Sequence, residues 1–227
     1  MARQSFLPKY RDQKSGWFLG TTWTIKYADL SNLIAQCIAA WPYVDLEMAV
    51  LLSTLLGSAA NPTAAALTVI RRFSNAQEVV HAAAEAALNE KELRLIEALL
   101  AVVKTASNAR DDLAHGLWGF WDGVTDKLIW VEAKHAVPWA SRLRGMQYRK
   151  ADDPEVVAIH EALLPYLFVY TRDDLREAQD LIEKAWEYIW KTVEFLGTED
   201  VDLRDTRYDQ LCREPRIREA LDRPKKS

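Results

Sequence analysis

Residues 90–115 read EKELRLIEALLAVVKTASNARDDLAH. The apolar side chains of this stretch recur every three or four positions, which places them on one face of an α-helix. Asn89 precedes the stretch as a capping residue, and Gly116 follows it as a stop signal. The pattern therefore predicts one long helix whose apolar face is buried against other helices.

Helical periodicity continues on both sides of this stretch. Pro42 is expected to end the first helix, Asn61–Pro62 has the cap-then-proline order of a helix start, and Thr171 is expected to cap a long helix. The predicted helices cover residues 29–41, 45–56, 61–73, 74–88, 90–115, 154–164, 171–196 and 207–221. The fold class predicted from this pattern is all-α.

The pattern changes after residue 116. The runs LWGFW and KLIWVEA are rich in β-forming residues and are separated by the turn-forming DGVTD, which predicts a β-hairpin over residues 117–133. Residues 137–153 are basic and show no clear period, so they are expected to be irregular. The prediction is a single domain over residues 1–227, with its core at about 30–197, a small hairpin insert and a charged tail at 200–227.

The amino-acid composition limits the kinds of fold and function that the chain can have. The chain has 227 residues, of which 49% are hydrophobic and 27% charged, as in ordinary globular proteins. Its formal charge of −4 provides no global basic field for nucleic acid, so any such contact must be local. The eight Gly and eight Pro leave little turn chemistry for a many-stranded sandwich.

The expected compartment is the cytoplasm. Cys37 and Cys212 are too few for a disulfide framework and have no zinc-ligand spacing to histidines, so we expect reduced thiols, no metal and no cofactor. The N-terminus lacks the apolar core of a signal peptide. Residues 48–70 carry no formal charge, but Gly57 and Pro62 interrupt them, which favours two buried helices over a membrane span.

Arg110 has an unusual position on the long predicted helix. An advance of 100° per residue places it in the apolar arc, seven residues after Val103. A guanidinium in such an arc costs free energy unless an anion or a hydrogen-bond acceptor meets it. Small residues surround it, and they would let a second helix or a ligand approach closely: Ala106, Ser107, Ala109 and Ala114.

Asp111 and His115 lie four residues apart, at the edge of the same arc. The carboxylate can hold one ring nitrogen of the histidine and orient the other. With Arg110 they supply a fixed cation, an orienting acid and a proton-transfer group, a set that suits phosphodiester chemistry without a metal. The alternative is structural: Arg110 pairs with a core acid and His115 bonds the terminal carbonyls of its helix.

The segment from Arg110 to His115 resembles the R-x4-6-H motif of the HEPN (higher eukaryotes and prokaryotes nucleotide-binding) superfamily. The match includes a polar residue after the arginine, here Asp111 where Asn is more frequent, and the following Gly116. The all-α organisation is also similar. Members modified at a tyrosine two places after the histidine differ from this chain, which has Leu117 there.

The resemblance implies a HEPN-like helical bundle that forms a homodimer, in which two motif helices build one composite site. It implies a metal-independent endoribonuclease of toxin or anti-phage defence type, with RNA as substrate and an antitoxin protein as a further partner. Arg110, Asp111 and His115 would be catalytic, and Asn108 and Trp118 would contact the substrate. The alternative is a non-catalytic module that binds a nucleotide or a protein, and for Trp118 the alternative is packing.

Overall fold

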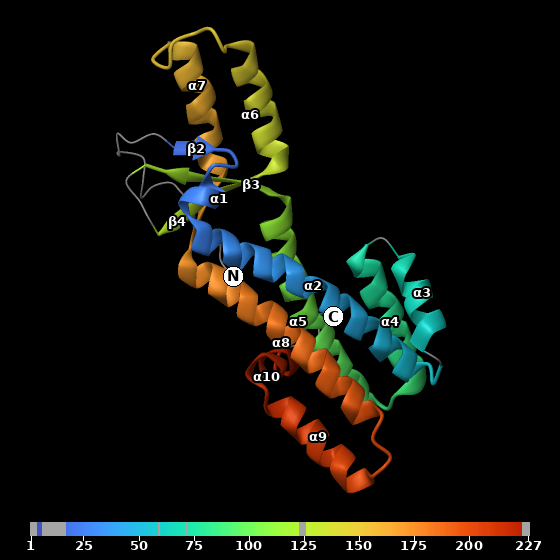
Figure 1. Cartoon of the computed structure of the whole chain (residues 1–227). Coiled ribbons are helices and arrows are strands. Elements are labelled where there is room, and N and C mark those ends of the chain that lie inside the picture. Colours follow the sequence, from blue (N-terminus) through green and yellow to red (C-terminus); the bar gives the residue numbers. More distant parts are fainter. Residues whose placement is uncertain (1–3, 6–16, 59, 71, 123–125, 224–227) are drawn as a thin grey trace. The chain divides into compact units, whose positions relative to one another are not determined.

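The structure is a computed structural model that describes residues 4–5, 17–58, 60–70, 72–122 and 126–223 (Figure 1). These residues are mostly helical, which confirms the predicted helical character. The chain divides into two compact units: residues 1–38 with 111–179, called unit 1, and residues 39–110 with 180–227, called unit 2. The predicted HEPN-like bundle topology and the single domain over residues 1–227 stay predictions.

The helices and strands have the following bounds. The first half of the chain contains β1 (Gln4–Ser5), β2 (Trp17–Leu19), α1 (Trp23–Lys26), α2 (Ala28–Leu55), α3 (Ala60–Thr68), α4 (Phe73–Ala87) and α5 (Glu90–His115). The second half contains β3 (Gly116–Trp121), β4 (Lys127–Glu132), α6 (Ala133–Gly145), α7 (Pro154–Leu163), the 3₁₀ turn η1 (Leu164–Tyr166), β5 (Leu167–Thr171), α8 (Arg172–Leu196), α9 (Val201–Arg213) and α10 (Pro215–Leu221).

Unit 1 is built on an antiparallel sheet in the order β1-β5-β4-β3-β2. The predicted hairpin is confirmed as β3 and β4, although residues 123–125 of its turn lie outside the described residues. The hairpin is not a small insert, because β2, β5 and the two-residue β1 extend it on both sides. β2 and β5 are not predicted from the sequence, because a short apolar run is equally compatible with a strand and with a helix.

The α6–α7 pair packs beside this sheet, with its connecting loop at the far end from the strands (Figure 1). One apolar cluster joins the pair to the sheet and includes Trp121, Val131, Ala136, Leu163 and Val169. The predicted α7 is confirmed, and Asp153 caps it by accepting a hydrogen bond from the backbone N–H of Glu155 at 2.9 Å.

His160 on α7 gives unit 1 a pH-dependent stability. Its ring lies edge-on to Trp17 and Trp139, with centroids 5.3 and 5.7 Å apart, and burial lowers its pKa below the usual 6.5. The unfolded chain therefore binds a proton more readily, so this contribution is present above pH 6.5 and is lost as pH falls through the folded-state pKa.

We expect the free energy of unfolding to fall less steeply between about pH 7.5 and about pH 5 in His160→Gln than in the wild type. Urea denaturation across this range measures the difference. An identical pH dependence in the two proteins would contradict the assignment.

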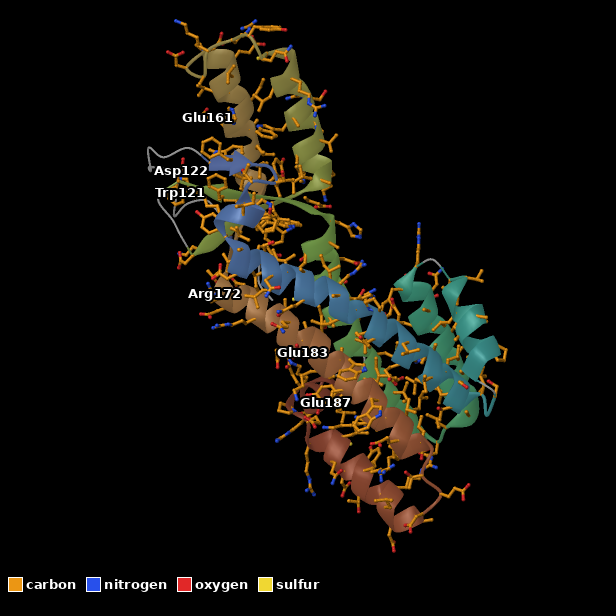
Figure 2. The ribbon with its side chains drawn as sticks, in the orientation of Figure 1. Trp121, Asp122, Glu161, Arg172, Glu183 and Glu187 are labelled. Carbon is orange, nitrogen blue, oxygen red and sulfur yellow. The ribbon has the colours of Figure 1, made fainter. Side chains whose placement is uncertain are left out.

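Unit 2 is helical. Its core contains Met48, Val80, Leu99 and Ile189, all fully buried, and the Gln77 side chain donates to the Leu100 carbonyl at 3.0 Å. Glu187 on α8 (Figure 2) pairs with Lys184 at 2.6 Å and with Lys191 at 2.7 Å. Lys191 also pairs with Glu214 at 2.6 Å, which ties α8 to the segment between α9 and α10.

Several helix boundaries follow the predicted caps. Asn89 accepts from the backbone N–H of Glu92 at 3.0 Å, and α5 covers the predicted residues 90–115. Thr171 and Asp174 form a reciprocal capping box at the start of α8, because each backbone N–H donates to the other's side chain, at 2.7 and 3.2 Å. These local signals are sufficient to set a boundary.

The structure differs from two expectations where a helix contains a proline. Pro42 was expected to end a helix, but α2 continues through it to Leu55. Pro138 lies inside α6, so the expectation of irregular structure is wrong for residues 137–145 and is confirmed for residues 146–153. A proline removes one helical hydrogen bond, and buried side chains on both flanks, such as Cys37 and Val44 in α2, offset that loss.

The C-terminal segment also differs from its prediction. One helix over residues 207–221 was expected, whereas α9 begins at Val201, where Asp200 caps it, and α10 begins at Pro215. Pro215 cannot continue α9 but suits the first position of a new helix. Residues 224–227 of the predicted tail lie outside the described residues.

Among the described residues, α2 is long and apolar enough to cross a membrane, and 44% of its most apolar 18-residue window is buried. Core helices of soluble proteins meet the same criterion, so the finding does not assign a location. The break expected within residues 48–70 is confirmed, because α2 ends at Leu55 and α3 starts at Ala60.

Candidate functional site

The predicted site residues follow one another along α5. Asn108, Asp111 and His115 are exposed to solvent, and Arg110 is half-buried. Asn108, Asp111 and His115 follow the i, i+3, i+7 spacing of one helix face, which continues the exposed Lys104. Arg110 lies five residues before His115 and so points about 140° away from it around the helix axis. The exposed face therefore includes His115 and Asp111, whereas the Arg110 side chain leaves the helix on a different side.

Two tryptophans of the hairpin hold the last turn of α5. The final carbonyls of a helix have no partner within it. The Trp130 indole N–H donates to the Asp112 carbonyl at 2.7 Å, and the Trp118 indole N–H donates to the Leu113 carbonyl at 3.1 Å. His115, which immediately precedes β3, is thereby fixed at a rigid junction of helix and strand.

Trp118 is consequently a packing residue in this structure. Its side chain is only 8% exposed, and its ring lies 5.9 Å from Trp23 and 5.1 Å from Tyr170. Its predicted contact with substrate would require this face to open. The structure therefore agrees with the packing alternative for the tryptophan-rich hairpin.

Replacing Trp118 by Phe tests the indole cap. We expect Trp118→Phe to lower the free energy of unfolding by about 1–3 kcal/mol, because it leaves the buried Leu113 carbonyl without its donor. Urea denaturation measures the change. Trp190→Phe is the control, since Trp190 is 46% exposed, and it should change stability by less than about 0.5 kcal/mol. Equal losses in the two variants would contradict the cap.

Arg110 has an acidic neighbour that sequence reasoning did not identify. Burial raises the pKa of the Asp45 carboxyl, while the Arg110 guanidinium and a hydrogen bond with Trp41 act in the opposite direction. Asp45 lies on α2, far from Arg110 in the sequence, so no local pattern could connect them. Asp45 is exposed, so it is an acid near the guanidinium and not the core acid of the structural alternative.

Three of the four small residues around Arg110 are buried within the chain. Ala106 is 0% exposed and Ser107 and Ala109 are 6% exposed each, whereas Ala114 is half-buried. The three buried residues are already covered by the chain's own side chains, so they cannot form the contact with a second copy that their size suggested. A second copy would have to meet α5 on its exposed polar face.

Asp111 and His115 are one helical turn apart, a spacing that allows contact between their side chains. No group of three or more potential metal ligands occurs among the residues that were placed.

Comparison with known proteins does not assign the chain to a family. No family model, no curated protein and no solved structure matches the chain.

Proposed function

We propose that the chain is a metal-independent endoribonuclease of the HEPN type, acting as a cytoplasmic homodimer. The proposal rests on the exposure of Asn108, Asp111 and His115 on one face of α5. Two indole N–H groups hold this end of the helix by hydrogen bonds to its last carbonyls. A fixed backbone with a solvent-accessible imidazole is what general acid–base catalysis requires. The toxin or defence role, with an antitoxin partner, is part of the same proposal.

Two copies would supply the two proton transfers of RNA cleavage. The imidazole of one His115 accepts the proton of the 2′-hydroxyl, the 2′-oxygen bonds to phosphorus, and the bond from phosphorus to the 5′-oxygen breaks. A protonated His115 of the second copy donates a proton to the departing 5′-oxygen. The products are a 2′,3′-cyclic phosphate and a 5′-hydroxyl. Asp111 would orient the imidazole. Arg110 leaves α5 about 140° around the axis from His115, so its side chain would have to extend around the helix to stabilise the charge on the phosphate oxygens.

The substrate provides the test of this chemistry. We expect the purified protein to cleave single-stranded RNA in excess EDTA and to leave a 2′,3′-cyclic phosphate, and we expect no cleavage of the same sequence with 2′-O-methyl groups. The product termini can be identified by mass spectrometry. Cleavage of the methylated strand, or its dependence on a divalent metal, would contradict the proposal.

A second candidate is a non-catalytic HEPN-like module that binds a nucleotide or a protein. The specific observation in its favour is the acidic neighbour of Arg110, because Asp45 competes with a phosphate for the guanidinium. The net charge of −4 agrees with it. This module would bind its ligand without cleaving RNA at any protein concentration.

A further inference from the structure

The loop end of the α6–α7 pair concentrates positive charge in an acidic protein. Residues 139–151 contain Arg142, Arg144, Arg149 and Lys150 and no acidic residue, whereas the whole chain has a net charge of −4. All four basic side chains are exposed. We call residues 139–151 the basic tip. It is the kind of local basic surface that an acidic protein would need to bind a polyanion.

The charges of the basic tip are only partly neutralised. Arg149 pairs with Glu155 at 2.7 Å and with Asp153 at 3.4 Å. The ion pairs found among the described residues include none with Arg142, Arg144 or Lys150. Three cations therefore remain available to an external anion.

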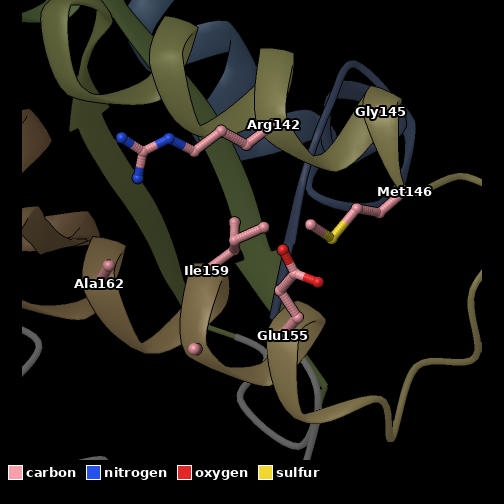
Figure 3. Close-up of a pocket in the computed structure, with 7 residues that line it drawn as sticks. Arg142, Gly145, Met146, Glu155, Ile159 and Ala162 are labelled. Atoms are coloured by element: carbon pink, nitrogen blue, oxygen red, sulfur yellow. The ribbon is translucent and has the colours of Figure 1, made fainter.

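Arg142 stands at a groove between α6 and α7 (Figure 3). The groove has a volume of about 510 Å³, with Arg142 on the α6 side and Glu155 on the α7 side. Met146 and Ile159 provide apolar surface between them. Because Glu155 is already engaged by Arg149, the carboxylate across the groove does not occupy Arg142.

Tyr148 adds an exposed aromatic ring to the same surface. Its side chain is 93% exposed, more than that of any other large hydrophobic residue described. An exposed ring between cations is the combination that binds single-stranded nucleic acid, where phosphates meet the cations and bases stack on the ring. A protein partner or a folded core would normally cover such a ring.

The register of the sheet relates the basic tip to His115. Gly116 pairs with Glu132, so the end of α5 and the start of α6 lie at the same end of the β3–β4 ladder. The thirteen residues of α6 then run from this end into the basic tip as far as Gly145, a length of about 20 Å at 1.5 Å per residue. A single RNA strand of several nucleotides could contact both places.

We propose that the basic tip binds the sugar–phosphate backbone of single-stranded RNA, with Tyr148 stacking on a base, and thereby holds the substrate of the His115 site. The identity of the ligand rests on the proposed function. The surface itself is separate from His115, so binding and cleavage can be tested apart.

The experiment measures RNA binding in the His115→Ala background, where cleavage does not interfere. Fluorescence anisotropy with a labelled single-stranded RNA should show that adding Arg142→Glu with Arg144→Glu weakens binding at least about tenfold. The slope of log affinity against log salt should become shallower by about 1.4, since about 0.7 is lost per phosphate contact on a single strand.

Matched variants control for charge and for stability. Arg176→Glu with Arg218→Glu makes the same change in net charge at exposed positions outside residues 139–151, and it should alter affinity by less than about threefold. Tyr148→Ala should weaken binding at least about fivefold and Tyr148→Phe should retain it, because Phe keeps the stacking face. Circular dichroism establishes that each variant is folded.

The outcomes separate this inference from the proposed function. Equal weakening by the tip and control pairs, or no effect of the tip pair, would overturn the inference while RNA cleavage by the wild type still stood. Binding of the tip to anionic lipid vesicles in place of RNA would also overturn it. Failure of the wild type to cleave, with RNA binding lost only in the tip variants, would overturn the proposed function and retain the inference.

Discussion

His115→Ala should lower the rate of RNA cleavage by about 10²–10⁴-fold, the usual contribution of a general acid or base. The imidazole is exposed at the end of α5, and its backbone is held by the indole bonds to the preceding turn. Loss of the imidazole should therefore act on proton transfer and leave the fold intact. Single-turnover cleavage of a labelled RNA in EDTA measures the rate.

The control for this variant is another histidine. His81 on α4 lies 3.6 Å from Glu85 and Glu97 in ion pairs of unit 2 and has no place in the proposed chemistry. His81→Ala should cleave RNA within about threefold of the wild-type rate. A His115→Ala protein that cleaves as fast as the wild type would remove His115 from the mechanism.

Gly116→Ala should be among the most damaging single changes to stability. A Cβ at this position would lie 1.6 Å from the Trp130 indole nitrogen, and Trp130 is only 1% exposed and holds the Asp112 carbonyl. The indole cannot move aside without losing its packing and its hydrogen bond. We expect the free energy of unfolding to fall by at least about 3 kcal/mol, at the upper end for overpacking.

Gly145→Ala is the matched control for this steric argument. No atom lies within 4 Å of a Cβ at Gly145, the last residue of α6. Alanine there should raise stability by about 0.4–1 kcal/mol, because it restricts the unfolded chain. Chemical denaturation of both variants gives the comparison. A Gly116→Ala protein as stable as the wild type would contradict the packing described for Trp130.

The sequence predicted elements whose signals are local. The α5 boundaries followed from Asn89 and Gly116, and the start of α8 from Thr171. The helix end expected at Pro42 is wrong, because buried residues on both sides of that proline, such as Cys37 and Val44, continue α2, and the basic composition of residues 137–153 did not reveal α6. No local signal predicted the two indole caps or the position of Asp45, since these contacts join residues that are distant in sequence or specific in orientation.

The sequence identified which side chains belong to the candidate site but not which residues around them are buried. Helical spacing predicted that Asp111 and His115 lie one turn apart at the edge of the apolar arc, and in the structure both are exposed, as is Asn108. Spacing did not reveal that Ala106 and Ala109 are covered by the chain itself. The burial of a helix residue depends on the elements that pack against the helix, and the sequence of the helix alone does not reveal them.

A mixed dimer tests whether two copies of α5 form one cleaving site. Wild-type and His115→Ala chains with different tags can be co-expressed and purified in sequence through both tags, so that each mixed pair holds one intact His115. We predict that this mixed pair cleaves RNA in EDTA at least about tenfold more slowly than the wild-type pair, because one of the two proton transfers then has no imidazole. A mixed pair that keeps half of the wild-type rate or more, or a wild-type protein that light scattering shows to be a monomer with RNA bound, would contradict a site shared by two copies.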